Sequence, residues 1–179
     1  MLPEKRVIIR EVALRDGLQS EKEFIPTNIK LEVIKALSQA GIEYLETTSF
    51  VSPKAIPQLR DAADLMAQVE RGKLKHEVLI PNLKGAQRAL EAKVDRLIVV
   101  VSASEAHNQA NVRRSIAESL GDLEAIFKLA KSNNVPVAGV ISVAFGCPFE
   151  GRVPRENVLS IARHFIEKGA DRICLADTT

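Results

Sequence analysis

The sequence predicts an α/β fold built from repeated β/α units. Short apolar runs alternate along the chain with segments whose apolar residues recur every 3.6 positions. The run Leu97–Val101 is apolar at every position, as expected for a parallel strand that is buried on both faces. Polar residues also gather where the predicted strands end. We therefore expect a parallel sheet covered by helices.

In chain order, the first strand is expected at Val7–Val12, a run rich in β-branched residues. The helix that follows keeps an apolar stripe from residue 29 to residue 40 and ends before Gly41, a residue type that commonly follows helix C-termini. The second strand is expected at Tyr44–Thr47, with a helix over 59–69 after it. These elements make two β/α units.

The third strand is expected at Glu77–Ile80 and the fourth at Arg96–Val101, with a helix over 83–92 between them. Ser115-Ile116-Ala117-Glu118 is a capping box, which predicts the start of a helix that continues to residue 130. The fifth strand is expected at Val137–Val143.

A last helix is expected between Pro154 and Gly169, followed by a sixth strand at Arg172–Leu175. The junctions at 40–47, 92–98 and 169–175 share one plan, a helix end, a turn with an acid and a buried strand, which predicts successive right-handed crossovers.

Two architectures contain such units, a (β/α)8 TIM barrel and a doubly wound open sheet. The barrel is favoured because polar residues end successive strands, and in a barrel those ends meet at the catalytic face. Such residues are Arg15, Asp16, Glu46, Ser142 and Asp177. A complete barrel takes about 250 residues, so we expect a barrel truncated after about six strands, in a single partial domain over residues 1–179.

The composition excludes several classes of protein. Lys and Arg number 25 against 23 Asp and Glu, a net charge of +2 without a basic stripe, so nucleic-acid binding is not expected. No apolar run is long enough for a membrane span, and membrane association is not expected either. The two cysteines form no disulfide framework and suit a reducing compartment.

The strand ends hold the candidate site residues. Asp16 could coordinate a divalent cation, and Arg15 could hold a carboxylate or carbonyl through paired hydrogen bonds. Asp16-Gly17 is equally a common turn pair. Glu46 is a candidate general base or a partner for Arg15, and Asp177 occupies the matching position in the sixth strand. Each of the two acids could instead be structural.

Four motifs resemble those of the hydroxymethylglutaryl-CoA lyase family. They are Glu11–Gln19, Glu46–Lys54, Pro81–Gly85 and Gly146–Gly151. The first is shared with Claisen-type relatives such as isopropylmalate, homocitrate and citramalate synthases, whereas the second and fourth are more particular to the lyases. The likeness runs through essentially the whole chain.

The resemblance implies a TIM-barrel metalloenzyme of leucine degradation that splits 3-hydroxy-3-methylglutaryl-CoA into acetoacetate and acetyl-CoA. It implies that Asp16 is a ligand of Mg²⁺ or Mn²⁺ and that Arg15 stabilises the enolate oxygen. Glu46 would lie beside both, and Asp177 would be a further polar residue of the pocket. The candidates for substrate binding are Arg15, Gln19 and Ser142.

The family's His-x-His metal pair, its metal-binding Asn and its mobile-loop Cys are not among these residues, so we expect this chain to be inactive by itself. Two alternatives stay open: a Claisen-type condensing synthase and a non-catalytic barrel remnant that binds an acyl-CoA. The resemblance implies an acyl-CoA substrate, a homodimer for the complete protein, and a cytoplasmic location, or the mitochondrial matrix in a eukaryote.

Overall fold

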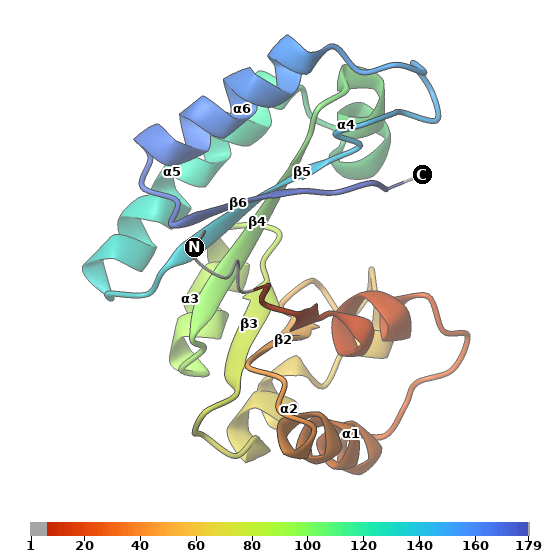
Figure 1. Cartoon of the computed structure of the whole chain (residues 1–179), viewed down its shortest axis with the longest axis vertical. Coiled ribbons are helices and arrows are strands. Elements are labelled where there is room, and N and C mark those ends of the chain that lie inside the picture. Colours follow the sequence, from red (N-terminus) through yellow and green to blue (C-terminus); the bar gives the residue numbers. More distant parts are fainter. Residues whose placement is uncertain (1–6, 179) are drawn as a thin grey trace, which may run out of the picture.

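The computed structural model describes residues 7–178, which form one six-stranded sheet and the helices around it (Figure 1). The strands are β1 Arg10–Glu11, β2 Tyr44–Ser49, β3 Lys75–Leu79, β4 Arg96–Ser102, β5 Val137–Ser142 and β6 Arg172–Leu175. The α-helices are α1 Thr27–Gln39, α2 Ala62–Gln68, α3 Leu83–Glu91, α4 Glu105–Val112, α5 Ile116–Ser132 and α6 Arg155–Glu167. A π-helical turn at Ala13–Gly17 and a 3₁₀ turn at Pro57–Leu59 complete the elements.

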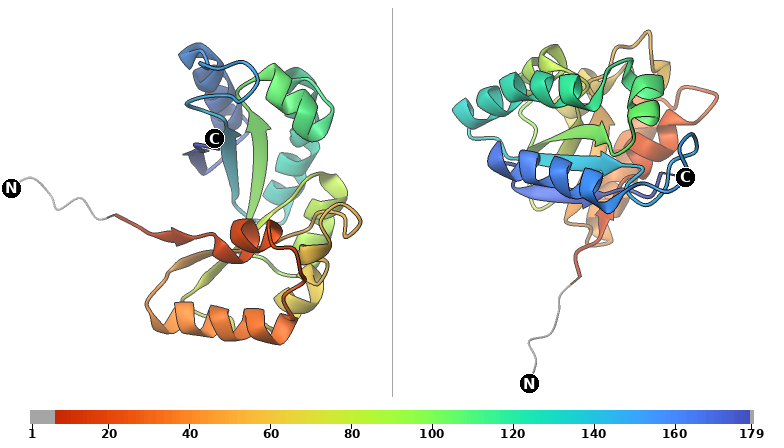
Figure 2. Two further views of the ribbon diagram at one scale, coloured as in Figure 1. Left: turned by 90° about the vertical axis from the view of Figure 1, so that its right-hand side faces the viewer. Right: turned by 90° about the horizontal axis from the view of Figure 1, so that it is seen from above.

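The strand order distinguishes the two predicted architectures. All neighbouring strands pair in parallel, and their order in the sheet is β1-β2-β3-β4-β5-β6. A doubly wound sheet reverses its order near the middle, whereas a barrel adds each strand beside the previous one. The sheet is strongly curved, with the helices on its outer side (Figures 1 and 2). The chain therefore forms a partial TIM barrel, and this prediction is confirmed.

The predicted length of the first strand is wrong. Only Arg10–Glu11 pair with β2, whereas a strand was expected over Val7–Val12. Val7 is 83% exposed and Ile9 is 68% exposed, because β1 is an outer strand with a neighbour on one side only. β-Propensity favours an extended segment but supplies no partner for its backbone groups.

One helix was not predicted. α4 carries only two alanines and a valine among eight residues, so it has no apolar stripe from which to recognise it. It begins because the side chain of Ser104 caps it, accepting a hydrogen bond from the amide of His107. By contrast, the capping box predicted at Ser115 and Glu118 is present at the start of α5.

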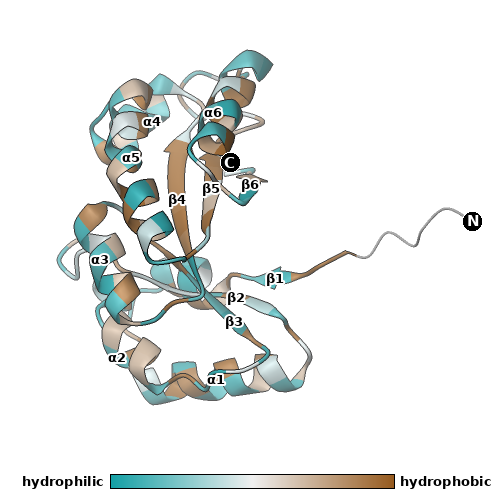
Figure 3. Cartoon of the chain, turned by 90° about the vertical axis from the view of Figure 1, so that its left-hand side faces the viewer, coloured by the Kyte–Doolittle hydropathy of each residue, from teal (hydrophilic) through white to brown (hydrophobic). Residues whose placement is uncertain are grey.

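The core lies between the sheet and the outer helices. In β4, Leu97, Val99 and Val101 are buried, while alternate residues face the inside of the curve. Phe127 of α5 and Phe165 of α6 pack in this layer, with ring centroids 6.4 Å apart. In Figure 3, β4 and β5 are strongly hydrophobic and the helices carry their hydrophilic residues largely on the side away from the sheet.

Gly139 of β5 is needed for this packing. A Cβ atom built there would lie 2.6 Å from Cγ and 2.8 Å from Cε2 of Phe165. We expect Gly139→Ala to destabilise the fold by about 1–3 kcal/mol through overpacking, measured by urea unfolding. Gly121→Ala is the matched control, because nothing lies within 4 Å and alanine favours the helix; it should stabilise by about 1 kcal/mol. Equal effects at both sites would contradict this packing.

An ionic layer fills the inner side of the sheet at the amino-terminal ends of the strands. Glu77 has no exposed surface and accepts hydrogen bonds from Arg96 (2.6 Å) and Arg172 (2.6 and 3.0 Å). The Nε atom of Arg10 lies 2.8 Å from Oε2 of Glu77. Asp171 in turn pairs with Arg96. One carboxylate thus ties together strands β1, β3, β4 and β6.

Within residues 7–178 the outer strands β1 and β6 each have one free edge. Leu175 at the end of β6 is 50% exposed. Because unpaired strand edges pair readily with other chains, we expect the isolated chain to associate in solution. Light scattering should find species larger than a monomer, and Leu175→Lys should reduce their fraction. A monodisperse monomer at all concentrations would contradict this expectation.

Candidate active site at the carboxyl ends of the strands

The segment after β1 presents Arg15 and Asp16 at the carboxyl end of the sheet. Their backbone amides both donate to the carbonyl oxygen of Val12, at 3.1 and 2.8 Å, within a short π-helical turn. Leu14, which directly precedes them, is only 2% exposed and anchors the turn in the core. A π-helical turn thus stands where Asp16-Gly17 suggested a simple turn, and it leaves Arg15 half-buried and Asp16 exposed.

Arg15 is held between two carboxylates. Its Nε donates to Glu46 Oε1 at 2.5 Å, and its Nη1 donates to Asp16 Oδ1 at 2.6 Å. Glu46 was predicted as a base or as a partner for Arg15, and the structure has it as that partner. Within residues 7–178, Nη2 of Arg15 has no hydrogen-bond acceptor. The guanidinium is thus fixed in place and keeps donors for a ligand oxygen.

Burial raises the pKa of Glu46 above its ordinary value of 4.5, and the nearby negative charges of Asp16 and Glu77 act in the same direction. The hydrogen bond and positive charge of Arg15 act in the opposite direction without cancelling the effect of burial. A carboxyl with a raised pKa takes up a proton more readily than a surface glutamate.

A buried salt bridge holds the segment that follows this motif. Lys30 of α1 is 1% exposed, and its Nζ lies 2.6 Å from Asp61 Oδ1. Thr27 donates its hydroxyl to the other oxygen of Asp61 at 2.8 Å. Nearby, Gln58 donates to the carbonyl oxygen of Glu21 at 2.7 Å. These bonds connect α1 and the loop before it to the segment that follows β2.

Thr48 of β2 is a buried polar residue that sequence reasoning did not single out. It follows Glu46 across an irregularity in the pairing of β2 with β3, and it is completely buried. Its hydroxyl has no hydrogen-bond partner among the described residues. The motif Glu46–Lys54 contains it, but only the strand register shows that the hydroxyl needs a partner.

The other predicted residues occupy different parts of the same edge. Gln19 follows the π-helical turn and is half-buried. Ser142 ends β5, is 7% exposed, and its hydroxyl lies 3.0 Å from that of Ser102. Asp177 follows β6, is exposed, and forms no ion pair with any residue between 7 and 178. The structure thus joins Arg15, Asp16 and Glu46 directly but leaves the other three outside this contact.

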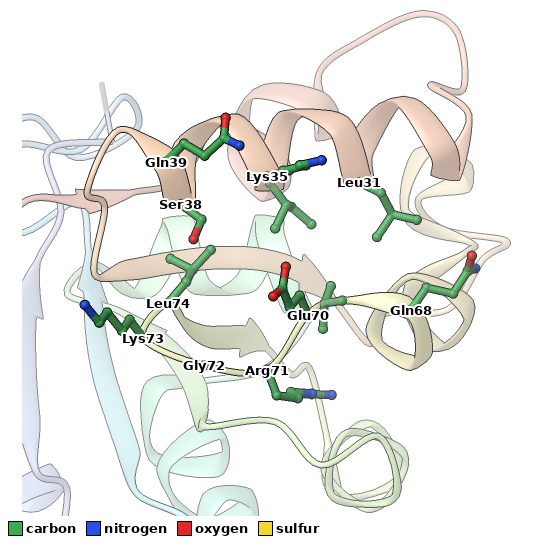
Figure 4. A pocket seen from close by; sticks show the side chains of 12 residues that line it. Leu31, Lys35, Ser38, Gln39, Gln68, Glu70, Arg71, Gly72, Lys73 and Leu74 are labelled. Carbon is green, nitrogen blue, oxygen red and sulfur yellow. The ribbon is translucent and has the colours of Figure 1, made fainter.

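A cavity of about 400 Å³ lies elsewhere, between α1 and the segment 68–74 (Figure 4). Leu31 and Leu74 line it together with charged side chains such as Lys35 and Glu70. Leu74 immediately precedes β3, so the cavity lies beside the amino-terminal end of that strand. It is therefore separate from the candidate site.

The described residues do not by themselves form a metal site. Across residues 7–178, no group of three or more His, Cys, Asp or Glu side chains could hold a metal ion. The Asp16 carboxylate is exposed, and one of its oxygens is already hydrogen-bonded to Arg15. One carboxylate is too few ligands for tight binding of Mg²⁺ or Mn²⁺. The predicted role of Asp16 as a metal ligand stays a prediction.

Comparison with known proteins places these residues in a family. A family model described as HMGL-like matches residues 6–179. The chain belongs to the HMGL-like family. Human mitochondrial hydroxymethylglutaryl-CoA lyase is 41% identical over 175 residues, which are 97% of this chain and 54% of the human protein. The hydroxymethylglutaryl-CoA lyase YngG of Bacillus subtilis is also 41% identical, with 97% and 58% covered.

Solved structures of HMGL-like proteins have the same fold. An HMG-CoA lyase from Acinetobacter baumannii, in complex with coenzyme A and 3-methylmalate, superposes with a TM-score of 0.92 at 42% identity. The match covers 96% of this chain and 56% of that one. Hydroxymethylglutaryl-CoA lyase from Pseudomonas aeruginosa gives 0.93 at 39% identity, covering 97% and 58%. The chain therefore spans little more than half the length of these relatives.

No helix among the described residues is both long enough and apolar enough to cross a membrane.

Proposed function

We propose that this HMGL-like chain provides the enolate-stabilising half of the active site of a carbon–carbon lyase that acts on 3-hydroxy-3-methylglutaryl-CoA. The observation that carries the proposal is the guanidinium of Arg15, fixed by Glu46 and Asp16 with free donors at the carboxyl end of the sheet. The lyases of human and Bacillus subtilis, each 41% identical to it, support the same reaction class.

The proposed reaction breaks the bond between C2 and C3 of the acyl group. The C3 hydroxyl loses its proton and becomes the ketone of acetoacetate, while the electron pair of the broken bond passes to the thioester as an enolate. A proton then adds to C2 and gives acetyl-CoA. The negative charge of the enolate makes this step difficult, and hydrogen-bond donors that are already in place lower the barrier.

In this proposal Arg15 donates to the enolate oxygen, and Glu46 keeps the guanidinium in position. The ion pair with Glu46 is largely buried and holds the guanidinium in one orientation. The hydrogen-bond donors of Arg15 therefore need no rearrangement during the reaction. Asp16 provides one oxygen ligand for the Mg²⁺ or Mn²⁺ that the family resemblance implies. Gln19 and Ser142 contact the acyl-CoA, and Asp177 borders the pocket from β6.

A chimera tests the function. Residues 1–179 are joined to the part of the Bacillus subtilis relative that this chain does not match, and the release of acetoacetate and acetyl-CoA is measured with Mg²⁺ or Mn²⁺. We expect turnover by the chimera, and acyl-CoA binding without turnover by the 179-residue chain. Condensation of acetyl-CoA with a 2-oxo acid would identify a synthase instead. A folded chimera that binds acyl-CoA without any reaction would favour a non-catalytic remnant.

We also propose that the complete protein is a homodimer, and that it resides in the cytoplasm or the mitochondrial matrix. Relatives of both locations exist, since the human protein is described as mitochondrial and a rat protein, 40% identical, as cytoplasmic. Sedimentation of the chimera measures the oligomeric state.

A further inference from the structure

Three side chains form a hydrogen-bonded chain beside the candidate site. Ser102 ends β4 and Ser142 ends β5, and the two residues are paired across the sheet. Their hydroxyl oxygens are 3.0 Å apart. Ser102 Oγ also lies 2.7 Å from Nδ1 of His107, in the first turn of α4. The chain therefore runs from His107 through Ser102 to Ser142.

The inner face of the sheet carries both serines. Arg96 points inward to the ionic layer, and Ser102 is six residues later in the same strand, so its side chain is on the same face. Because both serines end their strands, they lie at the carboxyl edge where Arg15 and Glu46 are found. Ser102 is 1% exposed and Ser142 is 7% exposed, so water does not easily replace either partner.

His107 is held firmly at its end of the chain. Its amide donates to the Ser104 hydroxyl at 3.1 Å, and its ring packs against Phe149 with the centroids 6.2 Å apart. The next residue, Asn108, accepts a hydrogen bond from the amide of Ser102 at 3.2 Å. The end of β4 is thus joined to α4 twice, through the Ser102 hydroxyl to His107 and through the Ser102 amide to the side chain of Asn108.

The backbone is strained directly after Ser142. Val143 has a φ of +50°, which is rare for a β-branched residue. Its amide donates to the hydroxyl of Thr178 beyond β6, at 2.9 Å. Such strain concentrates at sites that must hold a side chain in one orientation. This observation is independent of the hydroxyl chain and concerns the residue that directly follows Ser142.

The direction of the hydrogen bonds depends on His107. A serine hydroxyl has a single proton to donate. If Nδ1 carries no proton, the Ser102 hydroxyl donates its proton to Nδ1 and accepts a hydrogen bond from the Ser142 hydroxyl. Ser142 can then accept a hydrogen bond from a ligand but cannot donate one. If Nδ1 carries a proton, it donates to Ser102 and Ser102 donates to Ser142, so the proton of Ser142 is free.

We propose that His107 is a positioning residue that acts through Ser102, and that with Nδ1 protonated it makes Ser142 a hydrogen-bond donor to a carbonyl oxygen of the bound acyl-CoA. This inference rests on the proposed function and adds to it a specific role for Ser142. Protonation of Nδ1 increases the affinity for a ligand that accepts a hydrogen bond from Ser142. Because such coupling is reciprocal, the bound ligand increases the protonated fraction of Nδ1 by the same factor.

The test uses acetyl-CoA and the 179-residue chain. We expect Ser142→Ala and His107→Phe each to weaken binding about three- to tenfold, as for loss of one hydrogen bond, with calorimetry as the measurement. The double variant should bind no more weakly than either single one, because both remove the same bond. Ser132→Ala is the control, since its hydroxyl bonds only to Leu129 and Asn133 at the end of α5, and it should leave binding unchanged.

A spectroscopic measurement separates this role from a structural one. The ¹⁵N shift of His107 Nδ1 reports whether that nitrogen carries a proton. We expect acetyl-CoA to increase the protonated fraction in the unsubstituted chain, and not in Ser102→Ala. Additive effects of the two variants, or an Nδ1 state that acetyl-CoA does not change, would overturn the inference. Failure of the unsubstituted chain to bind acetyl-CoA would overturn the proposed function as well.

Discussion

Replacement of Arg15 by glutamine is expected to lower kcat for acetoacetate release by the chimera about 10²–10³-fold, the usual effect of removing a donor aimed at a developing oxyanion. Glutamine can still hydrogen-bond Glu46 but carries no positive charge. The variant also leaves Glu46, a buried acid with a raised pKa, without its cation, which makes its protonation easier still. The lost positive charge is the effect that removes stabilisation of the enolate.

The effect should fall on kcat more than on KM, because the enolate exists only after the bond is broken. Arg15→Lys keeps the charge but loses the fork that reaches both Glu46 and Asp16, so we expect an intermediate rate. Arg114→Gln is the control; this arginine is 52% exposed and its ion pair is with Asp122 on the surface. An Arg15→Gln chimera with unchanged kcat would exclude the proposed role.

Replacement of Glu77 by glutamine is expected to destabilise the fold by about 3–5 kcal/mol, as when one partner of a buried ion pair is removed. The carboxylate is the shared partner of Arg10, Arg96 and Arg172, and glutamine leaves their three positive charges close together with only Asp171, the other partner of Arg96, to compensate them. Urea unfolding at neutral pH measures the change in the free energy of unfolding.

Glu124→Gln is the matched control, because the pair of Glu124 with Lys168 lies on the surface and should contribute at most about 1 kcal/mol. Similar losses in the two variants would show that the ionic layer is no more important than a surface pair.

Acid should reproduce part of the effect of the Glu77 substitution. Burial tends to raise the pKa of Glu77, but hydrogen bonds from Arg172 and Arg96 and the charges of Arg172 and Arg10 lower it below its ordinary value of 4.5. A folded-state pKa below the unfolded one gives stability that is present above about pH 4.5 and is lost as the pH falls through the folded value. Unfolding curves of Glu77→Gln should therefore change less between pH 7 and acid than those of the unsubstituted chain.

The ionic layer is a departure from the usual barrel interior, which is filled mainly by branched aliphatic side chains. Here Arg10, Glu77, Arg96 and Arg172 occupy the inner face at the amino-terminal end, beside a cavity of about 350 Å³.

Local sequence patterns were sufficient for the order and type of most elements. The buried run at Leu97–Val101 and the capping box at Ser115 depend on residues a few positions apart, and both were predicted correctly. The motif around Arg15 pointed to the right edge of the sheet and to the family. These signals are local, because the patterns of strand burial, helix periodicity and helix capping each depend on residues that are only a few positions apart in the sequence.

Pairings between distant residues could be decided only by the tertiary structure. Glu77 meets arginines from β1, β4 and β6, and no pattern within a single strand indicates which charges will share a layer. The orphan hydroxyl of Thr48 and the contact of Ser102 with Ser142 depend likewise on strand register. Register follows from which side chains each face of the assembled sheet buries. The short first strand shows that an apolar run becomes a strand only where a neighbour pairs with it.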